Sequence, residues 1–357
     1  MSSHFFISSA RRGSVLTAAA SLGTWWLAAP PATTTTECSG APALYFFDLD
    51  GTIVGSPSRA EGQKFFLDFW RKQQREAPAT QRPMLCYNTA RCIKDYESLR
   101  NKTAEEGLAL PEPDLLITGD GTEVRWRGQL DQVWDRRIRE HWRESGLERR
   151  VRAAMDPLDA GLITNLNDED NSASLGGEYR YAITVTSAEA ADAVVARLRS
   201  TFGRDCNVYK VPCGSWIADG SSPDAHMVSA LPGLTHKGKA AQYAAHCLGR
   251  MAWKQVPGGD CETRDAPWGG EVERIGEWDD NVVAAGDTIG DAPMLWTGVR
   301  FVAVGNSSDC LVSNLRASAR GSDTHYVATG ANAFGVIEGL RHFGAVAASS
   351  GSSSSSS

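Results

Sequence analysis

The feature that most constrains the fold is a series of short apolar segments, each of which ends directly before polar residues. Such segments are typical of buried strands that give way to loops. Segments with helical periodicity, such as 63–74 and 239–251, lie between several of them. Short apolar strands that alternate with helices predict a doubly wound α/β fold, a parallel sheet with helices on both faces. The apolar segments are 43–47, 84–87, 115–118, 282–285 and 301–304.

The polar residues that follow these segments are candidates for a functional site, because ligands of parallel sheets bind beyond the carboxyl ends of the strands. Asp48 and Asp50 follow the first segment and can be directed at one centre. One carboxylate can take up a phosphoryl group, while its neighbour protonates the leaving oxygen and later removes a proton from water. The alternative is a turn that carries two solvated acids. The other strand ends carry Thr89, Asp287 and Asn306.

A second unit is expected between residues 125 and 232, where the pattern changes. This stretch contains a charged helical region, a helix at 188–202 and strand candidates at 179–185, 208–211 and 215–218. We interpret it as an α+β cap inserted into the core. The polar, Gly-rich segment 258–280 has no periodicity and is expected to be a loop. The resulting division is a leader at 1–40, a first core part at 41–124, the cap at 125–232, a second core part at 233–345, and a Ser-rich tail at 346–357.

The first 36 residues have the composition of a targeting peptide, because they contain an Arg pair and a short apolar run but no Asp or Glu. Both an export signal and a plastid or mitochondrial transit peptide fit, and a cytoplasmic protein with an unprocessed tail is the alternative. No apolar run reaches the roughly 18–20 residues that span a bilayer. The net charge of −7 argues against a nucleic-acid groove. The 8 Cys residues, none in a CxxC pair, are expected to be mostly free thiols, with a disulfide or zinc site as the alternative.

Four polar segments occur in a fixed order: Asp-Leu-Asp-Gly-Thr at 48–52, Asn-Thr-Ala-Arg at 88–91, His-Lys-Gly-Lys-Ala at 236–240 and Gly-Asp-Thr-Ile-Gly-Asp at 286–291. Together they resemble the four motifs of the haloacid dehalogenase-like hydrolases. The position of the insert resembles the branch of that superfamily with a large α/β cap, type IIB. Within this branch, 113–124, Trp-Asp at 134–135 and Ala-Leu-Pro at 230–232 resemble sucrose-phosphate phosphatases.

The resemblance implies a role for each matching residue. Asp48 would be the nucleophile, Asp50 the general acid/base, and Thr89 a hydrogen-bond donor to the phosphoryl group. Lys237 would balance negative charge. Phosphate or substrate contacts are expected from Thr52, Asn88, Thr89 and Lys237. A Mg²⁺ site is expected at Asp48, Asp50 (through its carbonyl), Asp287 and Asp291, the last of which would orient a metal-bound water or Lys237.

The function implied is a Mg²⁺-dependent phosphatase that acts on a small sugar phosphate, with sucrose 6-phosphate as the leading substrate. The alternatives are a phosphatase of another sugar or sugar-acid phosphate, a phosphosugar mutase, and a non-catalytic sugar-phosphate-binding module. Asn-Lys-Thr at 101–103 and Asn-Ser-Ser at 306–308 match the glycosylation acceptor pattern, which matters only in a secreted chain.

Overall fold

The computed structural model describes residues 42–55, 59–155, 162–165, 178–212, 224–253, 276–318 and 323–346. The expected leader at 1–40, the strand candidate at 215–218 and nearly all of the Ser-rich tail lie outside these residues.

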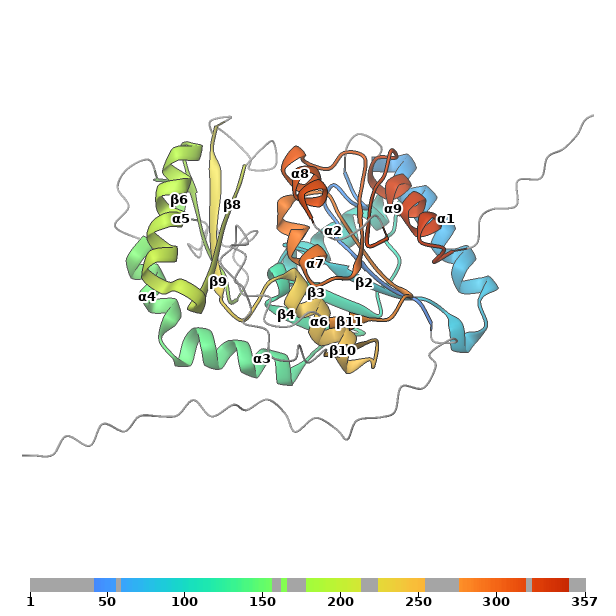
Figure 1. Cartoon of the computed structure of the whole chain (residues 1–357), viewed down its shortest axis with the longest axis horizontal. Coiled ribbons are helices and arrows are strands. Elements are labelled where there is room, and N and C mark those ends of the chain that lie inside the picture. The colour runs from blue at the N-terminus through green and yellow to red at the C-terminus, as the bar shows by residue number, and fades with distance from the viewer. Residues whose placement is uncertain are drawn as a thin grey trace, which may run out of the picture. The chain divides into compact units, whose positions relative to one another are not determined.

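The core is an eight-stranded sheet with the order β14-β13-β12-β1-β2-β3-β4-β5 (Figure 1). The six strands from β14 to β3 are parallel, and β4 and β5 add an antiparallel edge. Because β1 lies between β12 and β2, the loop that follows it is central at the carboxyl edge. The strands are β1 Leu44–Phe47, β2 Met84–Asn88, β3 Leu115–Thr118, β4 Glu123–Trp126, β5 Gln129–Leu130, β12 Val282–Gly286, β13 Arg300–Ala303 and β14 His325–Val327.

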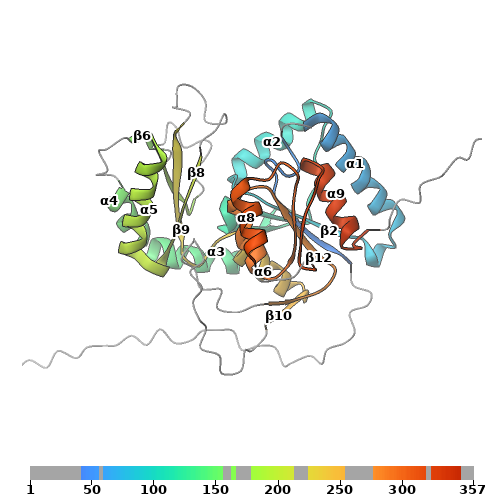
Figure 2. The same cartoon turned by 45° about the horizontal axis from the view of Figure 1, so that its top comes forward.

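Helices cover both faces of this sheet, which confirms the predicted doubly wound α/β core. Side chains alternate along a strand, so Tyr45 and Phe47 pack against α1, α2 and α9, whereas Leu44 and Phe46 face α6, α7 and α8. In Figure 2, α1 and α9 lie side by side. The helices are α1 Arg59–Glu76, α2 Ile93–Glu105, α6 Lys237–Cys247, α7 Ala292–Trp296, α8 Asp309–Ala317 and α9 Asn332–His342.

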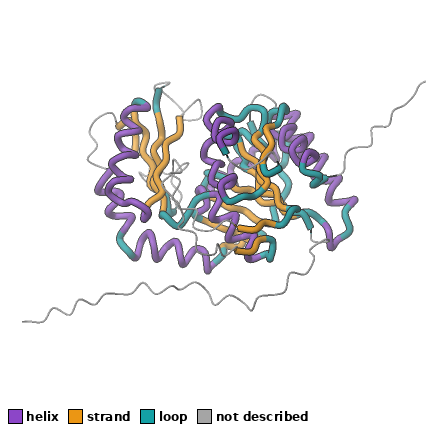
Figure 3. Tube along the Cα trace, viewed as in Figure 1, coloured by secondary structure: helices purple, strands orange, loops and turns teal. Residues whose placement is uncertain are grey.

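The insert is a four-stranded antiparallel sheet with the order β6-β7-β9-β8, joined in the chain to the core between β5 and α6. Helices α4 and α5 pack on this sheet, as Figure 3 shows. Its elements are α3 Gln132–Arg139 with a π-helical turn Glu140–Glu144, α4 Leu147–Met155, β6 Leu162–Asn165, β7 Tyr181–Val185, α5 Ala188–Phe202, β8 Cys206–Pro212 and β9 His226–Pro232. The predicted end of the first core part, residue 124, is too early, because the core sheet continues through β4 and β5 to Leu130.

Two expected elements differ in extent. The helix expected at 239–251 begins at Lys237 and ends at Cys247, and Met251–Trp253 forms a strand, β10. This strand pairs antiparallel with β11, Gly276–Trp278, so the last part of the expected 258–280 loop is a strand. A three-residue strand has no periodic signal of its own, and its partner is distant in sequence.

The described part of the chain contains free thiols, as predicted, at Cys86, Cys92, Cys206, Cys247 and Cys310. Every described helix falls short of the length and apolar character that crossing a membrane requires.

Candidate active site

The loop after β1 places Asp48 and Asp50 in different surroundings. Asp48 is buried, and its backbone N–H donates to the carbonyl of Ala285 at 3.0 Å. Asp50 is half-exposed, and both of its carboxylate oxygens accept hydrogen bonds at 2.7 Å from the guanidinium of Arg91. This charge-assisted, bidentate pair fixes the orientation of the Asp50 carboxylate. Although Arg91 belongs to the second polar segment, the sequence alone gave no indication of this partner.

Lys237, the first residue of α6, lies between two carboxylates. Its Nζ donates at 2.7 Å to Asp48 Oδ1 and at 2.7 Å to Asp291 Oδ1, and its side chain is 4% exposed. Burial alone would lower the pKa of Lys237, but the carboxylates of Asp291 and Asp48 outweigh burial and raise this pKa well above its usual value. Lys237 therefore stays protonated across the physiological pH range.

Asp287 and Asp291 come from the loop after β12. Asp291 Oδ2 accepts hydrogen bonds from the backbone N–H groups of Asp287 and Thr288, at 3.1 Å and 3.0 Å. Because Lys237 occupies the other oxygen, both oxygens of Asp291 are engaged within the protein. The carboxylate of Asp287 accepts a hydrogen bond from Thr52 Oγ1 at 3.3 Å.

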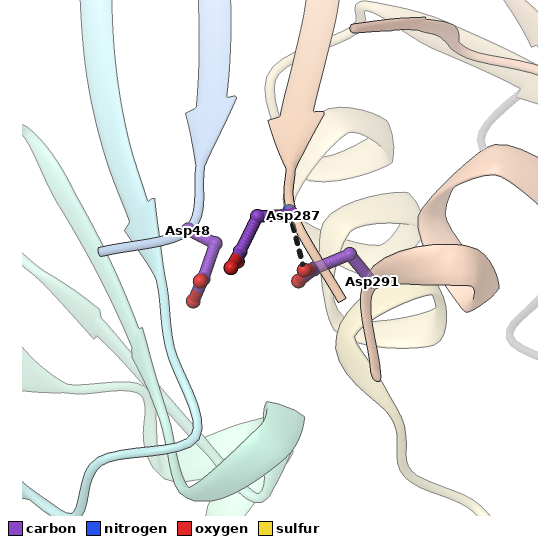
Figure 4. A group of neighbouring side chains, drawn as sticks. All are labelled: Asp48, Asp287 and Asp291. Atoms are coloured by element: carbon purple, nitrogen blue, oxygen red, sulfur yellow. Dashed lines mark hydrogen bonds between the residues drawn. The ribbon is translucent and has the colours of Figure 1, made fainter. Parts of the chain in front are cut away.

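Three carboxyl groups, those of Asp48, Asp287 and Asp291, converge at this point (Figure 4). Each offers an oxygen that lies within 4.8 Å of the others. Burial raises the pKa of Asp48 well above its usual value, against the lowering effect of Lys237. Burial and the charge of Asp291 raise the pKa of Asp287 to about 7. More negative charge is thus gathered here than one lysine compensates, so the cluster favours an additional cation.

Asn88 and Thr89, at the end of β2, are both fully buried. Asn88 Nδ2 donates to the carbonyl of Lys237 at 3.0 Å, so this amide holds the start of α6. Thr89 Oγ1 accepts from the N–H of Arg91 at 3.2 Å, which leaves its hydroxyl proton available for donation. Of the four expected phosphate contacts, Asn88 and Thr52 donate to other protein groups. Lys237 donates two of its three ammonium protons to Asp48 and Asp291, and Thr89 keeps its hydroxyl proton for donation.

The cap contributes a buried cation, Arg180, next to these residues. Its side chain is fully buried, and Nη1 donates to the carbonyl of Ala90 at 3.0 Å and to Asp120 Oδ2 at 3.1 Å. The hydroxyl of Tyr209 also donates to Asp120, while the backbone N–H of Asp120 donates to the carbonyl of Thr89 at 3.1 Å. The cap is thereby bonded to the loop that carries Thr89. Neither Arg180 nor Tyr209 lies in a motif or pattern that marks it in the sequence.

His236 caps α6 and makes the site sensitive to acid. Its Nδ1 accepts from the N–H of Lys239 at 3.0 Å, which requires a neutral ring. Burial and the charge of Lys239 lower the pKa of His236 well below its usual value. The unfolded chain therefore binds a proton near pH 6.5 that the folded chain does not, so stability is lost as the pH falls below about 6.5.

We expect His236→Asn to remove part of this pH dependence, because Asn also caps helices but does not titrate. A helix cap contributes about 1 kcal/mol, which corresponds to about 2–4 °C in Tm. Thermal unfolding at pH 7.5 and pH 5.5 measures the effect. The control is His342→Asn, at an exposed position at the end of α9. In this variant Tm should differ between the two pH values by as much as it does in the wild type. If Tm fell between pH 7.5 and pH 5.5 by the same amount in His236→Asn as in the wild type, His236 would not be the source of the acid sensitivity.

The chain is similar to known proteins both in sequence and in fold. The family model described as sucrose-6F-phosphate phosphohydrolase matches residues 41–208 and 272–344. A curated relative, the mannosylfructose-phosphate phosphatase of Agrobacterium fabrum, is 28% identical over 311 residues, which is 83% of this chain and 95% of the relative. The solved sucrose-phosphatase of Synechocystis, in complex with sucrose and phosphate, has a TM-score of 0.58 at 21% identity and covers 85% of this chain and 98% of its own.

At 21% identity, the similarity to the solved sucrose-phosphatase shows that the two chains share a fold. The family model matches more than half of this chain and therefore shows its family. The segments that carry the four expected motifs also meet at one place, through the contacts of Asp48, Asn88, Lys237 and Asp291. The chain therefore belongs to the sucrose-6F-phosphate phosphohydrolase family.

Proposed function

We propose that this sugar phosphatase hydrolyses a phosphorylated disaccharide through a phosphoryl group carried on Asp48, with Mg²⁺ bound beside it. The observation that carries the proposal is the buried cluster in which Lys237 bonds both Asp48 and Asp291 at 2.7 Å and Asp287 lies alongside. A buried carboxylate with a fixed cation on one oxygen and an uncompensated acid nearby suits attack on phosphorus, because phosphoryl transfer depends chiefly on positioning and charge neutralisation.

The proposed reaction has two displacements. An oxygen of Asp48 attacks phosphorus, the bond from phosphorus to the sugar oxygen breaks, and that oxygen receives a proton from Asp50. A water molecule then gives a proton to Asp50 and attacks the same phosphorus, which breaks its bond to Asp48 and releases phosphate. Through its two hydrogen bonds Arg91 orients the Asp50 carboxylate to receive the proton from water, and one of these bonds opens when Asp50 carries a proton.

The donor set fits Mg²⁺, which prefers carboxylate and carbonyl oxygens and retains several waters. Asp48 and Asp287 would hold the ion, together with the backbone carbonyl of Asp50. We assign Asp291 to the orientation of Lys237, since both of its oxygens are already engaged. When bound, the ion supplies positive charge to the phosphoryl oxygens. The hydroxyl of Thr89 would donate a hydrogen bond to the same phosphoryl oxygens.

The proposed substrate class rests on the relatives. The family description names sucrose 6F-phosphate, and the curated relative is named for mannosylfructose phosphate. Both compounds are phosphorylated disaccharides that contain fructose. The cap, which bonds the Thr89 loop through Arg180, would enclose such a sugar.

The test is phosphate release by the full chain from sucrose 6-phosphate, fructose 6-phosphate and glucose 6-phosphate, with and without Mg²⁺. We expect Mg²⁺-dependent release, fastest from the disaccharide, and no exchange of phosphate between sugars. Faster release from a hexose phosphate would overturn the substrate class. Recovery of an isomeric sugar phosphate would identify a mutase, and a folded protein that releases no phosphate would contradict the proposed reaction.

A further inference from the structure

The carbonyl of Gly51, between Asp50 and Thr52, accepts hydrogen bonds from two distant side-chain amides. Asn306 Nδ2 lies 2.8 Å and Asn332 Nδ2 lies 2.6 Å from this oxygen. The two asparagines also bond each other, because the N–H of Asn332 donates to Asn306 Oδ1 at 2.7 Å. We call Asn306 and Asn332 the asparagine bracket.

The backbone is constrained both at Gly51, which the bracket binds, and at Asn332, which belongs to the bracket. Gly51 has φ +78°, and a Cβ atom there would lie 2.0 Å from Asp287 Oδ2, so only glycine fits. Asn332 has φ +50° and is fully buried. A non-glycine residue in this conformation is uncommon and is retained where the surroundings require it. The contacts of Asn332 with Asn306 and Gly51 are such a requirement.

The bracket fixes the loop on which the proposed chemistry depends. Inside the loop, the N–H of Gly51 donates to the carbonyl of Val54 at 2.6 Å, but this bond does not connect the loop to the rest of the core. Arg91 holds the side chain of Asp50, and Asp287 accepts from Thr52. The backbone between Asp50 and Thr52 is joined to the C-terminal part of the sheet through the bracket, in which Asn306 follows β13 and Asn332 begins α9.

We infer that Asn306 and Asn332 are positioning residues for the general acid/base Asp50. This inference rests on the proposed function. Loss of the bracket frees the peptide group between Gly51 and Thr52, one residue beyond Asp50, and misplacement of a catalytic group by about 1 Å is sufficient to cost about 100-fold in rate.

The test compares two substrates with different demands for an acid. Sucrose 6-phosphate releases a sugar alkoxide that needs a proton from Asp50, whereas p-nitrophenyl phosphate releases a stable phenolate. We expect Asn306→Ala and Asn332→Gly to lower kcat/KM for sucrose 6-phosphate about 10- to 100-fold, and for p-nitrophenyl phosphate by less than about 3-fold. Glycine at 332 removes the amide without adding backbone strain.

The matched control is Asn314→Ala. Asn314 is half-buried on α8 and its Nδ2 donates to the carbonyl of Cys310 at 2.8 Å, so this variant also loses one amide–carbonyl bond but should keep wild-type rates with both substrates. Equal losses with both substrates, in step with a lowered Tm, would show a purely structural role and overturn the inference. Wild-type kinetics in both bracket variants would overturn it as well. A wild-type protein inactive on both substrates would overturn the proposed function, and the inference with it.

Discussion

Asp48→Asn is expected to lower kcat at least about 10³-fold while the protein stays folded. The substitution keeps the shape of the side chain but removes the oxygen nucleophile, and loss of a nucleophile in a covalent mechanism leaves only the contribution of binding and positioning. Since burial and the neighbouring acids Asp291 and Asp287 raise the pKa of Asp48, its ionised form is unfavourable in the metal-free protein. The Tm of the variant without metal should therefore match or exceed that of the wild type.

The measurement pairs phosphate release at saturating substrate with thermal unfolding. The control is Asp68→Asn on α1, where the carboxylate is exposed and belongs to none of the motifs. Both the activity and the Tm of this variant should remain at wild-type values. Activity within about 10-fold of the wild type in a folded Asp48→Asn protein would remove Asp48 from the role of nucleophile.

Lys237→Met is expected to impair both activity and stability. Methionine retains the length of the side chain but leaves Asp48 and Asp291 without the cation that now lies 2.7 Å from each. Removal of one partner of a buried ion pair costs about 3–5 kcal/mol, and loss of one preorganised charge at a reaction centre lowers kcat about 10²- to 10³-fold.

The stability loss should depend on pH in a defined direction. Without Lys237 the pKa of Asp48 rises further, so the folded state binds a proton more tightly than the unfolded state does. A raised carboxyl pKa gives stability that is present below about pH 4 and is lost as the pH rises, so the deficit of the variant should be larger at pH 8 than at pH 5. Thermal unfolding at these two pH values measures it, with Lys64→Met on exposed α1 surface as the control. A deficit that is independent of pH would contradict the charge argument.

The cap–core contact shows how the insert reaches the reaction centre. Arg180 is buried without exposed surface and bonds both Asp120 and the carbonyl of Ala90. A buried ion pair contributes little net stability, because desolvation offsets the attraction, but its geometry is specific. The Arg180–Asp120 pair therefore defines one position of the cap relative to the Thr89 loop. Asp120 itself adopts φ +57°, a conformation that the flanking glycines at 119 and 121 also adopt.

The periodicity of the sequence was sufficient to predict the core strands β1, β2, β3, β12 and β13 and the helix α5. Periodicity did not predict very short strands, nor the partners that side chains bond in the folded protein. The strands β10 and β11 have three residues each, too few for a pattern. The resemblance implied a phosphate contact for Asn88, but nothing in the sequence indicated that its amide nitrogen bonds the carbonyl of Lys237, a residue 149 positions away.

The sequence by itself determined the doubly wound core, the inserted α+β unit and the order of the four polar segments, because strand and helix periods and loop residues are local properties of the chain. Only the tertiary structure decided which distant groups complete the site. Arg91 reaches Asp50 across 41 positions, and Asn306 and Asn332 reach Gly51 across 255 and 281 positions. These contacts depend on which strands become neighbours and how far each loop extends. A local pattern encodes the face that a side chain occupies but not the partner that packing brings to it.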